Sequence, residues 1–308
     1  MDREVPVRGA SWESSVATNV VIVAGKGGVG KTTVTAVLAH AAARHGRDVL
    51  VIELDGKPTL EGLVGAAADD SESGRIDLVH ISAPEALDEY LREHGFARVA
   101  KRLQRTGVID IVGTAAPGID DVVVLGKVKQ LERAGDYDLV VVDGPAAGHA
   151  ITFLSSAAGL ADAVRGGPVK AQSDDVMELL TDGERCQVVL VTLPETTPVN
   201  EVIETAYALE EEVGVALGPV VVNGVDRGAS PPADVESLVA DLPTDDAEVL
   251  RAGAAFRRSR QAMERRVIER LRETLPLPQI ELPALPVAGV AADDIGTLVD
   301  ALIEGERR

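Results

Sequence analysis

One short glycine-rich stretch carries the clearest chemistry of the chain. Residues 25–33 read GKGGVGKTT and fit the spacing G-x-x-x-x-G-K-[ST]. Glycines lack a Cβ, so such a loop curls tightly and turns successive backbone N–H groups toward phosphate oxygens. Lys31 would reach the β- and γ-phosphates of a nucleoside triphosphate, and the Thr32 hydroxyl would ligate Mg²⁺. The residues expected to bind the nucleotide here are Gly27, Gly28, Val29, Gly30, Lys31, Thr32 and Thr33.

The sequence around this loop supplies the two elements that position it. Residues 19–24 read NVVIVA, a run rich in β-branched side chains that predicts a short strand. Residues 32–45 are rich in alanine and predict a helix, whose positive N-terminal end would point at the same phosphates. Because strand, loop and helix come in the order that a phosphate-binding loop requires, we set aside a glycine-rich turn that binds nothing.

A second lysine distinguishes this loop from most others of its kind. Lys26 follows the first glycine directly and cannot easily reach the phosphates that Lys31 already binds. The form K-G-G-V-G-K-T-T resembles the deviant Walker A motif of the ParA/MinD proteins, the nitrogenase iron protein and the ArsA/Get ATPases. The resemblance implies ATP as the nucleotide and a dimer in which Lys26 neutralises developing charge on the partner's nucleotide. The alternative is a solvated lysine on a loop.

Two aspartates follow apolar segments that predict strands. Residues 137–143 read YDLVVVD and residues 49–55 read VLVIELD. Parallel sheets bind ligands at the carboxyl ends of their strands, so both side chains would lie near the nucleotide. Asp143 would hold Mg²⁺ directly or through water, and Asp55 would orient or deprotonate the attacking water. A turn-forming aspartate is the alternative for each.

The segment after Asp143 narrows the resemblance to one branch. Residues 143–149 read DGPAAGH and are similar to the D-T-A-P-T-G-H switch II of the ArsA/Get ATPases. The resemblance implies that Gly148 and its neighbours move between ATP and ADP states, whereas His149 could equally be a helix-start histidine with no chemistry. Residues 55–60 read DGKPTL where the family has its D-P-A-H-x-L switch I. These departures weaken any inference about the hydrolysis rate.

Weaker matches extend the resemblance from about residue 19 to residue 300. Residues 117–120 read PGID, similar to a P-G-I-D-E segment of the family's helical region, and residues 193–195 read LPE. Asn223 matches the asparagine that contacts the adenine in family members, and its amide offers a purine both a donor and an acceptor. A turn asparagine before Gly224 is the alternative.

Strand-like and helix-like segments alternate along the chain. Strands are predicted at residues 19–25, 48–55, 77–82, 137–143, 187–193, 217–223 and 279–282. This alternation predicts an α/β fold with a mostly parallel, doubly wound sheet, and the resemblance implies a three-layer P-loop NTPase with an inserted helical region. We expect a polar N-terminal tail at 1–18 and a single domain at 19–305. Helical insertions are expected at about 84–135 and 150–185, and a long amphipathic helix at 244–275.

The charged residues of the chain limit the classes of partner that it is expected to bind. The formal charge of −20 disfavours duplex DNA, because phosphate contacts need clustered Lys and Arg. Residues 257–272 are a local exception, with seven arginines on a helix whose apolar side includes Phe256, Met263, Val267 and Leu271. This helix either has a solvated arginine face and a core-packed side, or it docks to anionic lipid or an acidic partner.

The sequence predicts a cytoplasmic protein without an integral membrane segment. The first 15 residues lack an apolar export signal, and no later stretch approaches about 18 uninterrupted apolar residues. Cys186 is the one cysteine, which excludes an intramolecular disulfide. It also excludes the metalloid-binding cysteines of the arsenite-pump ATPases and the zinc-bridging C-x-x-C of the tail-anchored-protein targeting ATPases.

We therefore expect a dimeric, Mg-ATP-dependent ATPase, similar to ArsA, that changes the conformation of a client protein or membrane transport partner. With one P-loop per chain, a lysine that acts in trans requires a homodimer or a heterodimer with a related ATPase subunit. A nucleotide-gated scaffold or chaperone-like adaptor with slow hydrolysis is the alternative. A ParA/MinD-like positioning ATPase is disfavoured, because residues 293–306 are acidic rather than a basic membrane helix and no nucleic acid partner is expected.

Overall fold

Seven parallel strands form one sheet at the centre of the protein. The computed structural model describes residues 12–15, 17–54, 59–65, 73–95, 98, 118–232 and 234–305. The strands lie in the order β3-β2-β4-β1-β5-β6-β7, and every neighbouring pair is parallel. They are β1 (Val20–Gly25), β2 (Val49–Glu53), β3 (Ile76–His80), β4 (Leu139–Ala146), β5 (Cys186–Thr192), β6 (Leu217–Val225) and β7 (Gln279–Pro283). The parallel α/β sheet predicted from the sequence is confirmed.

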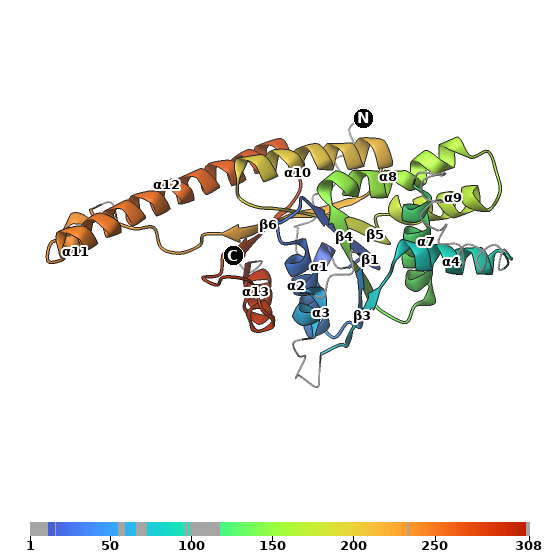
Figure 1. Ribbon diagram of the computed structural model, residues 1–308, viewed down its shortest axis with the longest axis horizontal. Helices are drawn as coiled ribbons and strands as arrows, with labels where there is room; N and C mark the ends of the chain where they lie inside the picture. The colour runs from blue at the N-terminus through green and yellow to red at the C-terminus, as the bar shows by residue number, and fades with distance from the viewer. Residues whose placement is uncertain are drawn as a thin grey trace, which may run out of the picture.

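Helices cover both faces of this sheet (Figure 1). Side chains alternate along a strand, so Val20 and Ile22 of β1 point to one face and Val21 and Val23 to the other. The first face packs against α4 (Ala83–Glu93), α7 (Ile119–Ala134), α8 (Ala147–Ala163), α9 (Pro168–Leu180), α10 (Thr196–Ala208), the π-helix η1 (Leu209–Val213) and α12 (Thr244–Thr274). The second packs against α1 (Trp12–Ser15), α2 (Lys31–Arg44), α3 (Thr59–Val64) and α13 (Ala292–Gly305). The two cores give three layers.

The central strand β1 sets the place of the site. All six of its residues are buried, and it lies between β4 and β5. Its valines and isoleucine favour the extended conformation and pack on both faces, as in strands covered by helices on either side. From β1 the chain goes to one side of the sheet for β2 and β3 and later to the other side for β5, β6 and β7. In such sheets the carboxyl ends of the strands where the order diverges are the usual ligand site.

The longest helix leaves the body of the protein (Figure 1). α12 has 31 residues, which corresponds to about 47 Å, and the short helix α11 (Glu236–Val239) lies at its far end. Its second half packs into the core through Val267 and Leu271, whereas Phe256 is 69% exposed. The sequence predicted Phe256 on the packed side of this helix. That prediction is wrong, because the helix lies beyond the sheet at this residue.

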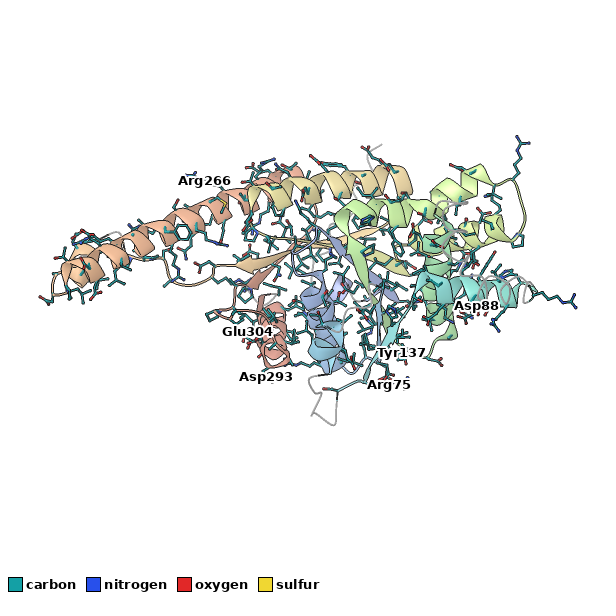
Figure 2. All side chains as sticks on the ribbon, in the orientation of Figure 1. Arg75, Asp88, Tyr137, Arg266, Asp293 and Glu304 are labelled. Atoms are coloured by element: carbon teal, nitrogen blue, oxygen red, sulfur yellow. The ribbon has the colours of Figure 1, made fainter. Side chains whose placement is uncertain are left out.

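Four of the eight arginines of this helix form ion pairs with described residues of the chain. Arg257 donates to Asp226, Arg260 to Glu264 and Arg272 to Glu281, at 2.8–3.0 Å. Figure 2 draws the side chains along the helix, including Arg266, which is exposed to solvent. The paired arginines support the interpretation of a solvated face.

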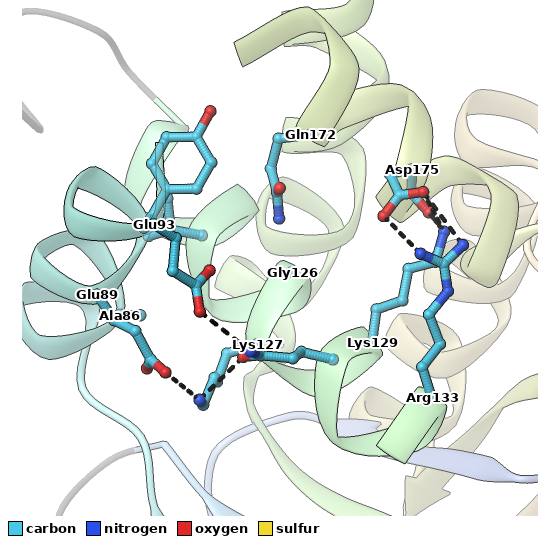
Figure 3. Close-up of a pocket in the computed structure, with 12 residues that line it drawn as sticks. Ala86, Glu89, Glu93, Gly126, Lys127, Lys129, Arg133, Gln172 and Asp175 are labelled. Carbon is cyan, nitrogen blue, oxygen red and sulfur yellow. Dashed lines mark hydrogen bonds and ion pairs between the residues drawn. The ribbon is translucent and has the colours of Figure 1, made fainter. Parts of the chain in front are cut away.

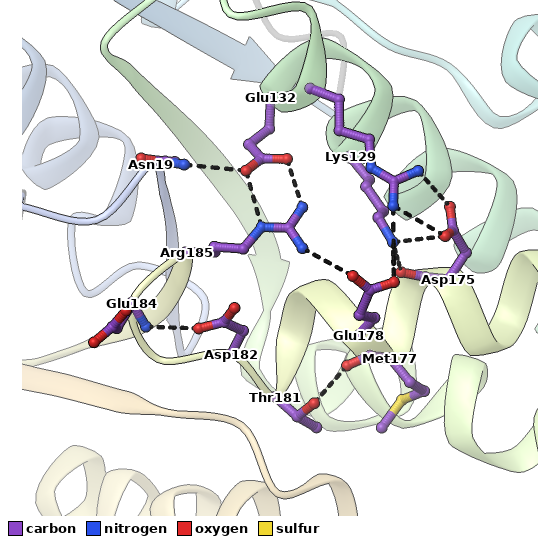
Figure 4. Close-up of polar contacts among 11 residues, drawn as sticks. Asn19, Lys129, Glu132, Asp175, Met177, Glu178, Thr181, Asp182, Glu184 and Arg185 are labelled. Atoms are coloured by element: carbon purple, nitrogen blue, oxygen red, sulfur yellow. Dashed lines mark hydrogen bonds and ion pairs between the residues drawn. The ribbon is translucent and has the colours of Figure 1, made fainter.

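Ion pairs join the helices near the amino-terminal ends of the strands (Figure 4). Glu132 of α7 accepts hydrogen bonds from Arg185 at 2.8 and 3.1 Å and from Asn19 at 3.1 Å. Burial raises the pKa of the Glu132 carboxyl, but these hydrogen bonds outweigh it and the net pKa is lowered. Lys129, 2% exposed, pairs with Asp175 of α9 at 2.8 Å. These contacts fix α7 and α9 to each other at the end of the sheet remote from the expected site.

Trp12 ties the start of the described chain to the core. It falls in the segment expected to be a polar tail, yet it is 1% exposed and packs edge-on against His45 at 4.9 Å between ring centroids. It belongs to the core cluster that also contains residues of α2 and α13. The isolated aromatic residue in a polar stretch was the signal for this contact.

Candidate functional site

The loop between β1 and α2 is pressed against the sheet on one side and open on the other. A Cβ on Gly25 would lie 2.4 Å from a backbone oxygen of β5, and one on Gly30 would lie 2.2 Å from Nδ2 of Asn223. Gly30 also has a φ of +92°, which L side chains rarely adopt. A Cβ on Gly27 or Gly28 would meet no atom within 4 Å. The open side, lined by backbone, is suited to the close approach of phosphate groups.

A threonine and an aspartate meet at the base of this loop. Thr32 Oγ1, in the first turn of α2, donates to Asp143 Oδ2 of β4 at 2.8 Å, and Thr35 Oγ1 lies 3.4 Å from Asp143 Oδ1. Hydroxyl and carboxylate oxygens are ligands that Mg²⁺ prefers. The two residues predicted as metal ligands are 111 positions apart in the chain, and the fold brings them together. This donor set fits Mg²⁺.

Asp143 lies inside its strand rather than at its end. The sequence predicted a strand that stops at Asp143, but β4 continues to Ala146 and pairs with β1 again at Gly25 after a shift in register. The strand can continue because Gly144 has no side chain and its backbone can approach β1 closely. A Cβ at this position would lie 2.5 Å from the carbonyl oxygen of Val23. The side chain of Asp143 therefore points from a paired, rigid backbone toward α2.

A second carboxylate, which the sequence did not single out, lies beside Asp143. Glu53, the last residue of β2, is the register partner of Asp143 on the neighbouring strand, so the two side chains point to the same face. Its side chain is 11% exposed, and Glu53 Oε2 lies 3.6 Å from Nδ1 of His80. Glu53 could have been identified from the sequence, because it is an acidic residue at the end of a predicted strand of a parallel sheet.

The two lysines of the loop have different partners. Lys31 Nζ donates to the backbone oxygen of Lys26 at 3.3 Å, so its amine is held at the loop. Lys26 Nζ forms an ion pair with Glu201 Oε1 of α10 at 2.5 Å, with the two side chains 44% and 37% exposed. Glu201 Oε2 is buried and has no hydrogen-bond partner. The pair holds Lys26 against its own chain, whereas the resemblance implies a lysine that acts on the partner's nucleotide.

Asn223 packs directly behind the loop. Its Nδ2 donates to the backbone oxygen of Val29 at 2.9 Å. Asn223 is in β6, and Val29 is 2% exposed. Asn223 therefore supports the loop through its amide N–H, and contact between its amide oxygen and a purine stays a prediction.

A cavity of about 260 Å³ opens where the predicted switch II segment meets α7. Its wall includes Pro145 and His149 from that segment and Asp121 from the first turn of α7. Burial raises the pKa of the Asp121 carboxyl, although a hydrogen bond from Ser156 of α8 and the nearby His149 act in the opposite direction. Gly148 lies in the first turn of α8, and Ser156 further along this helix contacts Asp121 of α7. The helix α8 therefore connects the predicted switch II segment to α7.

A second cavity, of about 210 Å³, lies among α4, α7 and α9 (Figure 3). Its charged side chains pair with one another: Lys127 with Glu89 at 2.6 Å, and Arg133 with Asp175 at 3.3 Å. None of its lining residues belongs to the loop or to the predicted switch segments. Its described lining residues therefore provide no link to the nucleotide loop.

Several sequence predictions fall outside the described residues. Asp55, the rest of segment 55–58 and Pro117 are among them, so their roles stay predictions. The described site residues come from three parts of the sheet. The loop and helix that follow β1 hold Gly27, Gly28, Lys31, Thr32 and Thr33, the second half of β4 holds Asp143, and the last part of β6 holds Asn223. Sequence reasoning missed Glu201, whose partner is 175 positions away, and Thr35, one helical turn after the expected ligand.

Comparison with known proteins finds relatives that align with nearly the whole chain. Residues 18–166 match the family model described as anion-transporting ATPase. The chain is 30% identical to ATPase BagA of Mycobacterium tuberculosis, in an alignment that covers 94% of this chain and 93% of the relative. It is also 30% identical to an arsenical pump-driving ATPase of Escherichia coli and 28% identical to one of Acidiphilium multivorum. Each of these two alignments covers 62% of this chain and 32% of the relative.

Proposed function

Because the chain belongs to the anion-transporting ATPase (ArsA) family and is an ATP-hydrolysing enzyme, we propose that it works as a Mg²⁺-dependent dimer. In this proposal ATP binding and hydrolysis change the conformation of a client protein or a membrane transport partner. The observation that supports it best is the contact of Thr32 with Asp143 at the base of a loop whose open side accepts phosphate.

Thr32 and Asp143 are the proposed Mg²⁺ ligands, directly or through water. When bound there, Mg²⁺ would neutralise charge on the β- and γ-phosphates. Lys31 would add its charge from the loop, and the amino-terminal end of α2 would add the partial charges of its N–H groups. Asp55 is the proposed group that orients or deprotonates the attacking water.

Lys26 is the proposed residue that acts on the partner's nucleotide. To do so it must leave Glu201, so the ion pair would hold the lysine in its own chain until a second subunit offers a more negative group. The pair is partly exposed, and such pairs are worth no more than about 1 kcal/mol. A bound triphosphate could therefore displace Glu201 at low cost.

Nucleotide state would reach the rest of the molecule through α8. Gly148 and His149 belong to its first turn, and Ser156 two turns further donates to Asp121 of α7 at 2.6 Å. A shift of the first turn would therefore move α7 relative to the sheet. The client surface is proposed to include these helices. Among the described helices, none combines the length and apolar character needed to cross a bilayer. Since ATP is supplied in the cytoplasm, the proposal places the protein there.

Phosphate release by designed variants tests the proposal. Asp143→Asn and Thr32→Ala should lose Mg²⁺-dependent turnover while they keep the fold. Lys26→Ala should keep binding of a fluorescent ATP analogue and lose turnover. Full turnover and normal dimerisation of Lys26→Ala would contradict the role in trans.

The Lys26–Glu201 pair also favours a second candidate, a nucleotide-gated scaffold or adaptor that hydrolyses ATP slowly. An ion pair worth about 1 kcal/mol would slow the chemical step by at most about five-fold without changing nucleotide binding. The departures of segment 55–60 from the family's switch I would account for the rest of the slow hydrolysis. This candidate predicts ATP-dependent capture of a partner with negligible phosphate release. Fast steady-state hydrolysis without any partner would exclude it.

A further inference from the structure

Three side chains that can carry charge form a row across neighbouring strands. In the order β3-β2-β4, Glu53 of β2 is the register partner of His80 on one side and of Asp143 on the other. Register partners on parallel strands point to the same face of the sheet. His80, Glu53 and Asp143 therefore lie side by side, and we name these three residues the charged row.

The charged row lies on the face of the sheet that α2 covers. Residues two and four positions before each member of the row share its face, because side chains alternate along a strand. All of these residues belong to, or pack against, the core cluster that contains α2, namely Val49, Val51, Leu139, Val141, Ile76 and Leu78. At one end of the row, Asp143 accepts a hydrogen bond from Thr32 of α2 at 2.8 Å. The row therefore begins at the proposed Mg²⁺ site and ends at the edge strand β3.

Glu53, in the middle of the row, is largely shielded from bulk water. Its side chain is 11% exposed, whereas that of His80 is 43% exposed. The two side chains approach to 3.6 Å between Oε2 and Nδ1, which is longer than a hydrogen bond but within the range of an ion pair. A shielded carboxylate is costly unless donors or positive charge face it. His80 supplies one such group on the β3 side, and the β4 side of Glu53 is the side of the proposed Mg²⁺ site.

The spacing of the row fits contact with the ion through one water. Neighbouring strands are about 4.8 Å apart, so two charged carboxylates on β2 and β4 would repel each other and favour a cation beside them. Mg²⁺ usually keeps several of its waters and binds protein through one or two carboxylates. One water between a cation and a carboxylate spans about 4–5 Å, which is close to the spacing of the strands. With Asp143 as the proposed ligand, Glu53 one strand away lies at the distance of a water-mediated contact.

We propose that Glu53 accepts a hydrogen bond from a water of the hydrated Mg²⁺ and that His80 positions the Glu53 carboxylate. The inference rests on the Mg²⁺ site proposed at Thr32 and Asp143, and it adds to that site a residue that the resemblance does not assign. Groups that act on a metal through its ligands typically change the affinity for the metal by about 10- to 100-fold. Glu53 would thus raise the affinity for Mg²⁺ without touching the ion.

Binding of Mn²⁺, followed by electron paramagnetic resonance, tests the contact without turnover. Mn²⁺ takes the same oxygen ligands as Mg²⁺, and a saturating non-hydrolysable ATP analogue fills the nucleotide site. Glu53→Gln keeps the size of the side chain and removes its charge, so it should weaken Mn²⁺ binding by about 10-fold or more. Glu61→Gln is the matched control, because Glu61 is exposed on α3, on the same side of the sheet, and it should bind Mn²⁺ like the wild type. Equal affinities of the wild type and Glu53→Gln would overturn the proposal.

Thermal unfolding separates a role at the metal from a purely structural one. Without metal, Glu53→Gln should unfold at or above the melting temperature of the wild type, because the repulsion from Asp143 is gone. Mg²⁺ should then raise the melting temperature of the variant less than that of the wild type, since weaker binding gives less stabilisation. A lower melting temperature without metal, together with an unchanged shift on addition of Mg²⁺, would make Glu53 a structural residue and overturn the proposal.

Turnover at raised Mg²⁺ concentration distinguishes this role from direct action on the attacking water. If Glu53 acts through the ion, Glu53→Gln should regain wild-type turnover once Mg²⁺ saturates the site. A loss of turnover that persists at saturating Mg²⁺, with unchanged affinity for Mn²⁺, would assign Glu53 to the attacking water and contradict the proposal.

A double-mutant cycle tests the part of His80. The contact between His80 and Glu53 is partly exposed, so His80→Ala should weaken Mn²⁺ binding by no more than about five-fold. In a Glu53→Gln background the same change should have no effect, because the group that His80 positions has lost its charge. Equal weakening in both backgrounds would exclude the positioning role.

The outcomes also separate this inference from the proposed function. Weak Mn²⁺ binding by Asp143→Asn, with normal binding by Glu53→Gln, overturns the role of Glu53 and leaves the Mg²⁺ site standing. Normal binding by Asp143→Asn overturns the site itself and, with it, the inference that rests on it.

Discussion

Replacing Glu201 by glutamine should increase ATP turnover if Lys26 acts on a partner subunit. The Lys26 and Glu201 side chains are 2.5 Å apart and 44% and 37% exposed, so the pair is closer to a surface ion pair than to a buried one. Such a pair contributes about 1 kcal/mol at most, which is a factor of about five in an equilibrium. Removal of the negative charge should raise the fraction of released Lys26, and with it turnover, by up to that factor.

Steady-state phosphate release at saturating Mg-ATP measures this effect, at protein concentrations where the dimer forms. Glu204→Gln is the control. Glu204 lies one turn further along the same helix, and its carboxylate takes no part in the ion pair. In a Lys26→Ala background the Glu201→Gln change should have no effect. A Glu201→Gln protein with unchanged or reduced turnover would refute the reasoning, as would an equal increase in the background without Lys26.

Three further predictions concern the site and its support. Asp143→Asn should reduce turnover by about 10³-fold, because a metal ligand loses its charge, and phosphate release against Mg²⁺ concentration would show it; an unchanged Mg²⁺ dependence would contradict the assignment. Gly30→Ala should lower the free energy of unfolding by about 1–3 kcal/mol, since its φ is +92° and its Cβ would meet Asn223 at 2.2 Å, and urea denaturation measures this; equal stability would be evidence against the close approach. Hydrogen bonds from Arg257 lower the pKa of Asp226 to about 2, so the pair stabilises the fold above the ordinary pKa of about 3.8 and this contribution is lost as pH falls toward 2. Asp226→Asn should flatten that part of the curve of unfolding free energy against pH, and an unchanged curve would show that the pair contributes nothing.

The sheet was predictable because its strands are short, continuous β-branched runs. Segments such as VVIVAG in β1 and VLVIE in β2 favour strands wherever they lie in the sequence. The loop was predictable for a different reason, since its spacing is fixed by the shape of phosphate groups. Helical periodicity likewise found α12, whose two ends agree with the expected tract.

Contacts across the chain were not predictable in the same way. The partner of Lys26 is 175 positions away, and no local pattern specifies it. Asp143 was found, but the continuation of β4 beyond it depends on the close pairing of Gly144 with β1. The exposure of Phe256 could not be deduced from periodicity, because a periodic pattern defines a face and does not say where the sheet beneath it ends.

A mixing experiment tests most directly whether Lys26 acts on the nucleotide of the other subunit. Lys26→Ala subunits are expected to bind ATP without a trans lysine, and Lys31→Ala subunits to keep Lys26 but bind ATP poorly. In a mixed dimer the Lys26 of the second subunit can reach ATP on the first. Equal mixing makes half of the dimers mixed, each with one working site, so turnover should recover to about a quarter of wild type from two inactive proteins. No recovery in mixtures shown to contain mixed dimers would contradict the account.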